Sequence, residues 1–213
     1  MTTNGKISVW TRSGKLEHAF NGGPTPLVAV AFSPDGRLVA GANRGGTATI
    51  WSTVSGRLQH RLRRARTPLT DVEFSHDGRF VATAAIGGDA RLWQVSNGIA
   101  IHTLKGHLGR IARVAFSPDD RWLVTAGPTT GGLWQVSTGR LLFYLRGHTN
   151  QLEDASFAPD GKHIVTASDD RTVRTYACTV CGSVYELARL AHAQLVHIAA
   201  LLTPRERRRY FGG

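Results

Sequence analysis

Residues 29–54 read AVAFSPDGRLVAGANRGGTATIWSTV, and this pattern returns three more times along the chain. At spacings of 42, 42 and 41 residues, the phenylalanine before its turn recurs as Phe32, Phe74, Phe116 and Phe157. With nearly the same spacing, the aromatic residue near its end recurs as Trp10, Trp51, Trp93, Trp134 and Tyr176. Two independent markers therefore share one period, and a period of about 40–45 residues is typical of the four-stranded blades of a β-propeller.

Each unit contains the strands and turns that a blade requires. Apolar or alternating stretches are separated by turns rich in Ser, Pro, Asp and Gly, and we expect the apolar inner strands to be buried on both faces. In the third turn Asp120 stands where the other turns have glycine, and aspartate tolerates the left-handed backbone of such a turn. The sequence predicts an all-β propeller over residues 1–181, with a half-blade at 5–22 and units at 26–64, 68–106, 110–147 and 151–177.

The two ends of this repeat are incomplete. The chain opens with a third and a fourth strand only, and the last unit lacks a fourth strand. Residues 15–20 could complete the last unit and close a ring. Alternatively, the blades form an open arc whose edges are covered by the tail or by another copy. We expect the open arc, with self-association through its blade edges, because the repeat starts in mid-blade.

The last 32 residues, 182–213, follow a different period. Apolar residues recur every three or four positions over residues 185–202, which predicts an amphipathic helix. Thr203 and Pro204 are typical of a new helix start, and a short basic helix to about Tyr210 is expected to follow. The sequence therefore predicts a basic, helical C-terminal tail outside the blades.

Composition excludes several classes of protein. No apolar run approaches the ~20 residues of a membrane span, and the polar N-terminus does not resemble a signal peptide. Only two cysteines occur, so a disulfide framework is not expected to hold the fold, and we expect the cytoplasm. The net charge of +11 is compatible with an acidic partner or nucleic acid, but the basic residues are spread as single Arg and Lys through the repeats, except in the runs at 60–66 and 205–209.

The repeat resembles the WD-repeat β-propeller family. The resemblance rests on the F-[SA]-[PH]-D-[GD] turns, the spaced tryptophans and the Gly-His pairs at 106–107 and 147–148. In that family a His, a Ser or Thr, an Asp and a Trp form a hydrogen-bonded tetrad that braces each blade. By position, the resemblance implies a structural tetrad made of His107, Thr125, Trp134, His148, Thr166, Asp170, Tyr176, Thr83, Trp93 and Trp51. The second unit has Ala65 and Gly87 at the His and Asp positions.

The resemblance also weakens a catalytic interpretation. His148, Thr166 and Asp170 could suggest a hydrolase triad, but threonine is a poor nucleophile without special activation. The bracing role accounts for the same residues, so we expect no catalytic residues, no enzymatic activity and no cofactor. The end of the chain, with Cys-x-x-Cys-Gly and an L-T-P-x-E-R-R stretch, resembles the C-termini of bacterial multidomain WD-repeat proteins. Those proteins often carry a STAND or kinase module, and neither a phosphate loop nor a kinase signature occurs here.

The cysteine pair allows three interpretations. Cys178, Cys181, His192 and His197 give a Cys-x2-Cys-x10-His-x4-His pattern, a ligand set that tetrahedral zinc sites use. The spacer is short, however, and two histidines five residues apart point about 140° apart on a helix. A redox pair is a second interpretation, and two small buried residues at a strand end are the third and favoured one.

The sequence favours a non-enzymatic scaffold or sensor that binds a protein or peptide at a propeller face, as the C-terminal part of a larger bacterial signalling protein. Inner strands carry Asp71, Glu73, Arg113 and Asp154, whose mixed signs suit polar protein contact. The stretch HRLRRAR at 60–66 lies between two units, where loops usually meet partners. We expect an acidic partner to contact Arg61, Arg63, Arg64 and Arg66. The alternative is a nucleic-acid-binding protein with a basic surface and a zinc-bound tail.

Overall fold

The computed structural model describes residues 5–63, 67–179 and 181, and within them the chain forms five antiparallel sheets. The first sheet has two strands, the next three have four each, and the last has three. Consecutive strands pair with one another throughout, so every sheet is a simple meander. This is the architecture that the repeat predicts, and we call the sheets the half-blade and blades 1 to 4.

The strands follow the repeat closely. The half-blade and blade 1 consist of β1 (Lys6–Trp10), β2 (Leu16–Asn21), β3 (Leu27–Phe32), β4 (Leu38–Asn43), β5 (Thr47–Ser52) and β6 (Leu58–Arg63). Blades 2 and 3 consist of β7 (Leu69–Phe74), β8 (Phe80–Ala85), β9 (Asp89–Gln94), β10 (Ala100–Lys105), β11 (Arg113–Phe116), β12 (Trp122–Ala126), β13 (Gly131–Gln135) and β14 (Leu141–Leu145). Blade 4 consists of β15 (Leu152–Phe157), β16 (His163–Ser168) and β17 (Val173–Ala177).

The turn between the first two strands of a blade has the geometry that its sequence predicts. In blade 1 the Ser33 hydroxyl donates to the Asp35 carboxylate over 2.6 Å, and Gly36 N donates to Ser33 O over 2.9 Å. Gly36 has a φ of 69°, and Asp120 adopts a φ of 56° at the corresponding position of blade 3. The left-handed backbone expected at Asp120 is therefore confirmed.

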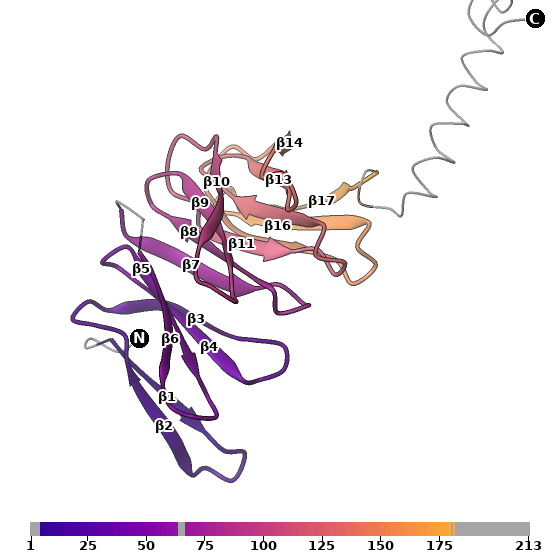
Figure 1. The fold of residues 1–213 in the computed structure, drawn as a ribbon. Helices are drawn as coiled ribbons and strands as arrows, with labels where there is room; N and C mark the ends of the chain where they lie inside the picture. Colours follow the sequence, from indigo (N-terminus) through magenta and orange to yellow (C-terminus); the bar gives the residue numbers. More distant parts are fainter. Residues whose placement is uncertain (1–4, 64–66, 180, 182–213) are drawn as a thin grey trace, which may run out of the picture.

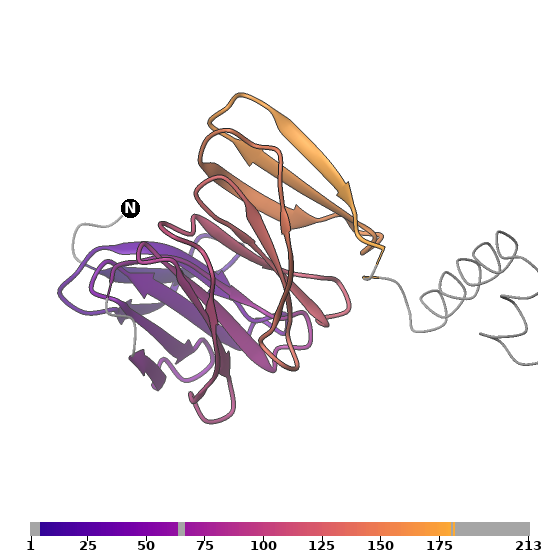
Figure 2. The same ribbon diagram turned by 90° about the horizontal axis from the view of Figure 1, so that it is seen from above.

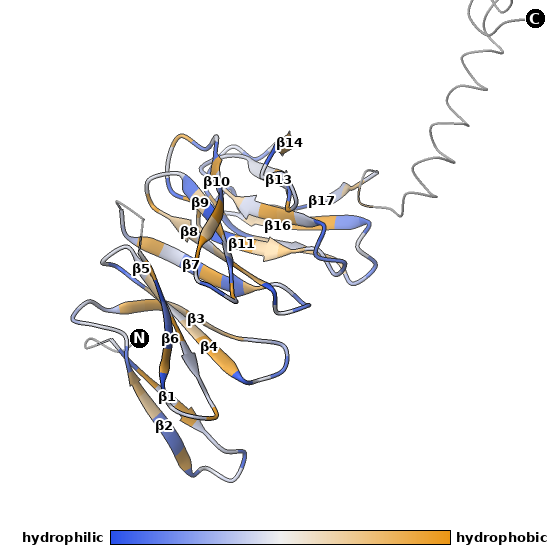
Figure 3. Ribbon diagram, viewed as in Figure 1, coloured by the Kyte–Doolittle hydropathy of each residue, from blue (hydrophilic) through white to orange (hydrophobic). Residues whose placement is uncertain are grey.

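The hydrophobic core lies in layers between neighbouring blades. One cluster joins Ala40 and Ile50 of blade 1 to Val72 and Val81 of blade 2, and equivalent clusters join blade 2 to blade 3 and blade 3 to blade 4. Figure 3 shows hydrophobic colour concentrated along the strands, whereas many of the connecting turns are hydrophilic. Stacking of blades thus buries the apolar faces that a single sheet would leave exposed.

The blades form an open arc, with the half-blade at one end and blade 4 at the other (Figure 1). The view from above in Figure 2 shows the last blade standing apart from the first sheets. Strand β2 pairs with β1, and among the described strands β17 pairs only with β16, so residues 15–20 do not complete blade 4. The open arc is the arrangement in this structure, and the ring is not.

The prediction that every inner strand is buried on both faces is wrong for β3. Val30 and Phe32 are 57% and 55% exposed, whereas Val114 and Phe116 of β11 are 0% and 3% exposed. The half-blade lacks the two strands that would cover this face of β3. The amphipathic helix at 185–202 and the basic helix after it lie outside the described residues. Within the described residues, no helix is long and apolar enough to cross a membrane.

Candidate functional site

Blade 3 contains a buried hydrogen-bonded brace. The hydroxyl of Thr125 on β12 lies 2.8 Å from His107 Nε2 and accepts the indole N–H of Trp134 over 2.9 Å. These three residues are at most 7% exposed. Burial lowers the pKa of His107 to about 4, so its imidazole is neutral near pH 7. The structure brings these predicted tetrad residues together, and the brace has no aspartate.

Blade 4 contains the most complete version of the brace. His148 Nε2 lies 2.8 Å from the Thr166 hydroxyl, and His148 Nδ1 lies 2.8 Å from Asp170 Oδ2. Hydrogen bonds from the side chains of Thr172 and His148 hold the pKa of Asp170 below its ordinary value. Tyr176 differs from the tryptophan that it replaces, because its hydroxyl donates to the carbonyl oxygen of Arg146 over 3.1 Å.

The brace of blade 4 has the geometry of a catalytic triad, but its side chains are too deeply buried to meet a substrate. A hydroxyl, an imidazole and a carboxylate follow one another at hydrogen-bond distance, as in the Ser-His-Asp arrangement. The side chain of His148 is 0% exposed and Thr166 is 1% exposed, so a substrate cannot reach the hydroxyl. The set therefore acts as a brace between the start of the blade and its middle strands.

Blades 1 and 2 contain only parts of the brace. In blade 2 the Thr83 hydroxyl accepts the Trp93 indole N–H over 3.0 Å, and Ala65, at the predicted His position, lies outside the described residues. In blade 1 Gly41 stands at the threonine position, pairs with Thr49 and leaves Trp51 without this bond. Trp51 instead packs against the ring of Phe20 from the half-blade, at a centroid distance of 5.6 Å.

Two acidic side chains on the inner strand β7 connect blade 2 to blade 3. Asp71 Oδ2 accepts the backbone N–H of Val114 over 3.0 Å, and Glu73 Oε1 accepts that of Phe116 over 3.2 Å. Both acceptors reach β11 from the neighbouring blade, where no β-ladder joins the two inner strands. The carboxylates thus replace the missing ladder partners of β11.

Burial dominates the electrostatics of this connection. Desolvation raises the pKa of Asp71 and raises the pKa of Glu73 to about 7. Arg113 Nε of blade 3 lies 3.8 Å from the Asp71 carboxylate of blade 2 and 3.5 Å from the Asp154 carboxylate of blade 4, so one positive charge links three blades. Some of the mixed charges on the inner strands therefore pair with each other between blades. The side chains of Arg113 and Asp154 are still more than half exposed.

Asp120 has a second role that its position in the sequence did not indicate. Its carboxylate accepts the backbone N–H groups of His76 and Asp77 over 2.8 and 2.7 Å, and it lies 2.9 Å from His76 Nδ1. The turn of blade 3 is thereby bound to the turn of blade 2. Only the spacing of 43 or 44 residues between the partners, close to one repeat, could have suggested the contact.

The cysteine pair forms a disulfide between Cys178 and Cys181, with a Cα–Cα distance of 5.2 Å. Both residues are buried against the core between blades 3 and 4, but the bond between them is not part of the favoured interpretation of two small buried residues. Zinc would require thiolates, which a disulfide does not offer. His192 and His197 lie outside the described residues, and no metal-ligating group of three side chains occurs among those described.

The arginine-rich stretch is only partly described. Arg61 on β6 is exposed and lines a polar hollow with Asn43 and Thr49. Arg63 ends β6, and the backbone there pairs with Thr47. Arg64 and Arg66 lie outside the described residues, so their contact with an acidic partner stays a prediction.

Comparisons with known proteins give two family matches. Residues 98–134 and 139–176 match the family model described as WD domain, G-beta repeat. Residues 2–113 match the model described as Eukaryotic translation initiation factor eIF2A. The WD-repeat matches cover the part of the chain that carries both histidine-containing braces.

A solved structure shows the same architecture. The crystal structure of the computationally designed Ika8 protein matches with a TM-score of 0.75 and 24% identity, over 82% of this chain and 53% of that one. This likeness concerns the fold alone, and the chain spans about half the length of that structure. No curated protein matches the chain.

Proposed function

The chain belongs to the WD-repeat β-propeller family and, through residues 2–113, to the eIF2A family, and from this membership we propose that it is a non-enzymatic module that binds other proteins. WD-repeat proteins are generally scaffolds without enzymatic activity. The family name of an initiation factor concerns that family and assigns no role in translation here. Fold alone leaves function open, so the proposal also needs an observation on the surface of the blades.

The observation that carries this proposal is an apolar pair on one face of the arc. Leu108, in the connection from β10 to β11, is 101% exposed, and Ile86, in the turn after β8, is 47% exposed. The two segments are in contact, because a Cβ at Gly88 would overlap the carbonyl oxygen of His107. Exposed aliphatic side chains on adjoining segments are typical of surfaces that bind other proteins.

Further proposals concern the location of the module, its parent protein and the surfaces that it uses. We infer a cytoplasmic sensor or scaffold at the C-terminal end of a larger bacterial signalling protein, on the basis of the Cys-x-x-Cys-Gly and L-T-P-x-E-R-R stretches. An acidic partner is proposed for Arg61, Arg63, Arg64 and Arg66. Self-association is proposed at the free edges of β1 and β17, because each has a strand partner on one side only among the described strands.

Photo-crosslinking from defined positions tests these contacts. A photoreactive amino acid in place of Leu108 is expected to capture a partner protein in cells of the source organism. The same residue in place of Val54, which is 74% exposed on a turn after β5, is the matched control and is expected to capture little. At Val173 on the edge strand β17, 68% exposed, it is expected to capture a second copy of the chain.

Leu108→Glu should abolish capture at a photoreactive residue placed at Ile86, while the melting temperature stays that of the wild type, because the side chain is fully exposed. Equal capture from Leu108 and Val54 would contradict a specific binding face. If the photoreactive residue captures a partner at Leu108 but no second copy of the chain at Val173, self-association is contradicted and partner binding is not.

Nucleic-acid binding is the second candidate, and the net charge of +11 is the observation that favours it. If several phosphates are contacted, the affinity for generic RNA or DNA should fall steeply with salt, by about 1,000-fold or more between 50 and 200 mM for six or more contacts. Fluorescence anisotropy over a salt series measures this dependence. Absence of binding at the lowest salt concentration would remove this candidate and leave the protein-binding proposal unaffected.

A further inference from the structure

Every contact between neighbouring blades joins two different faces. The face of blade 1 towards blade 2 consists of four side chains that are 0% exposed: Ala40, Ala42, Ala48 and Ile50. They pack in one cluster with the facing side chains of blade 2: Val72, Phe74, Val81 and Trp93. The corresponding positions meet between blades 2 and 3 and between blades 3 and 4. We call the first set of positions the forward face of a blade and the second set its backward face.

Within the described residues, the arc leaves part of one backward face uncovered. Val30 and Phe32 on β3 are 57% and 55% exposed, whereas Val72 and Phe74, at the same positions of blade 2, are 3% and 5% exposed. Strand β7 is covered because it lies against β3 and β4, the first and second strands of the preceding blade. The half-blade has only a third and a fourth strand, so β3 lacks these two neighbours.

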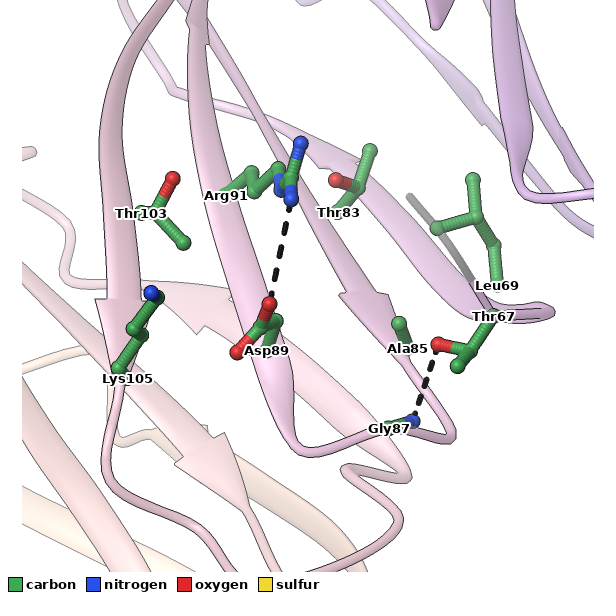
Figure 4. A pocket seen from close by; sticks show the side chains of 9 residues that line it. All are labelled: Thr67, Leu69, Thr83, Ala85, Gly87, Asp89, Arg91, Thr103 and Lys105. Carbon is green, nitrogen blue, oxygen red and sulfur yellow. Dashed lines mark hydrogen bonds and ion pairs between the residues drawn. The ribbon is translucent and has the colours of Figure 1, made fainter. Parts of the chain in front are cut away.

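A hollow of about 380 Å³ lies at this place, beside the free edge of β1. It is lined by Lys6, Ile7 and Ser8 of β1 and by residues 27–30 of β3, so most of its lining is apolar. A hollow of about 440 Å³ within blade 2 differs in character, because it is surrounded by charged side chains such as Asp89, Arg91 and Lys105 (Figure 4). The hollow at β1 therefore has the lining of a contact between blades.

The other end of the arc leaves a forward face uncovered by any described residue. By strand register, the forward positions of blade 4 are Val165, Ala167, Val173 and Thr175. Val173 is 68% exposed and Thr175 is exposed, in contrast to the buried forward face of blade 1. Strand β17 also has a partner on one side only among the described strands. One copy of the chain thus carries both halves of a blade-to-blade contact, at opposite ends of the arc (Figure 1).

We propose that copies of the chain associate head to tail, with blade 4 of one copy placed against β1 and β3 of the next. The forward face of blade 4 covers Val30 and Phe32, and the free edge of β17 pairs with the free edge of β1. Both are third strands of their blades, so they run parallel when the internal packing is continued in this way. The two surfaces differ, so the contact leads to a chain or a closed ring of copies. This inference rests on the proposed self-association, whose surfaces it names, and is independent of partner binding at Leu108.

Sedimentation velocity of the full chain tests the contact. We expect a dissociation constant on the order of 10 μM, because polar Thr175 stands where the forward faces of the other blades have Ile50, Leu92 and Leu133. Val30→Glu and Val173→Glu each place an unpaired charge in the contact and should weaken association about 100-fold or more. Ile99→Glu, at a position of blade 2 that is 60% exposed, is the matched control and should leave association unchanged. All three side chains are more than half exposed, so the melting temperatures should stay those of the wild type.

Mixing the two variants tests the direction of the contact. Val30→Glu retains an intact blade 4 and Val173→Glu retains an intact β3, so an equimolar mixture should form dimers with the wild-type affinity and nothing larger. If Val30→Glu does not fold, Phe32→Glu takes its place. A mixture that stays monomeric, or variants that associate as the wild type does, would overturn the assigned surfaces and leave self-association standing. A wild-type chain that is monomeric up to about 100 μM, well above the expected dissociation constant, would overturn both.

Discussion

Replacing Thr125 with valine is expected to lower the free energy of unfolding by about 3 kcal/mol. The Thr125 hydroxyl joins His107 and Trp134 and is 0% exposed. Valine has nearly the same shape, so little cavity forms, but the imidazole and the indole both lose their buried partner. Each unmatched buried group costs about 1–3 kcal/mol. Urea denaturation followed by tryptophan fluorescence measures the loss.

Thr83→Val in blade 2 is the matched control for this prediction. It removes the same hydroxyl from the same strand position, but only the Trp93 indole loses its described partner. The expected loss is about 1 kcal/mol, roughly a third of that at Thr125. Equal losses at the two positions would show that the histidine adds nothing to the brace.

Replacing Glu73 with glutamine is expected to stabilise the protein above pH 7, by about 1–3 kcal/mol, since each pKa unit is worth 1.36 kcal/mol. Burial raises the pKa of Glu73 from its ordinary 4.5 to about 7. The folded state therefore holds a proton that the unfolded state has released, and stability falls as the pH rises through this interval. Glutamine carries no charge, and its oxygen can still accept the N–H of Phe116.

The difference in unfolding free energy between Glu73→Gln and the wild type should thus be smallest at pH 4.5 and grow to pH 7. The nearby Asp71 adds to the cost of a charged Glu73, whereas Arg113 and His76 reduce it. Glu153→Gln removes the same charge from a side chain that is 44% exposed and pairs with Arg110. Its difference from the wild type should lack this rise. A flat difference curve for Glu73→Gln would contradict a buried, protonated Glu73.

The wild-type curve alone would hide this effect, because His107 acts in the opposite direction. Burial lowers the pKa of His107 from 6.5 to about 4, so the unfolded state takes up a proton that the folded state excludes. The contribution of His107 is therefore present above pH 6.5 and is lost as the pH falls towards 4. Between these values the slopes of Glu73 and His107 partly cancel. Differences between variants separate them.

The periodic features of the chain could be predicted from its sequence for a simple physical reason. Each blade is built from the same strands, turns and apolar faces, so the pattern of one unit predicts the structure of the others. The order of the strands in each unit is as expected, the left-handed backbone at Asp120 is confirmed, and two threonine–tryptophan pairs meet as the family resemblance implies. The sequence also indicated where the brace is incomplete, since Ala65 and Gly87 stand at the His and Asp positions of the second unit.

Contacts between different repeats could be found only in the tertiary structure. Whether Asp120 reaches the turn of blade 2, and whether Glu73 reaches the N–H of Phe116, depends on how neighbouring blades stack. The exposure of Phe32 likewise depends on the two strands that the adjoining half-blade lacks, which no local pattern encodes. The sequence by itself determined the blades, because their strands and turns are local. The tertiary structure decided the open arc and the connections between blades, because these depend on how residues about one repeat apart in the sequence come together in space.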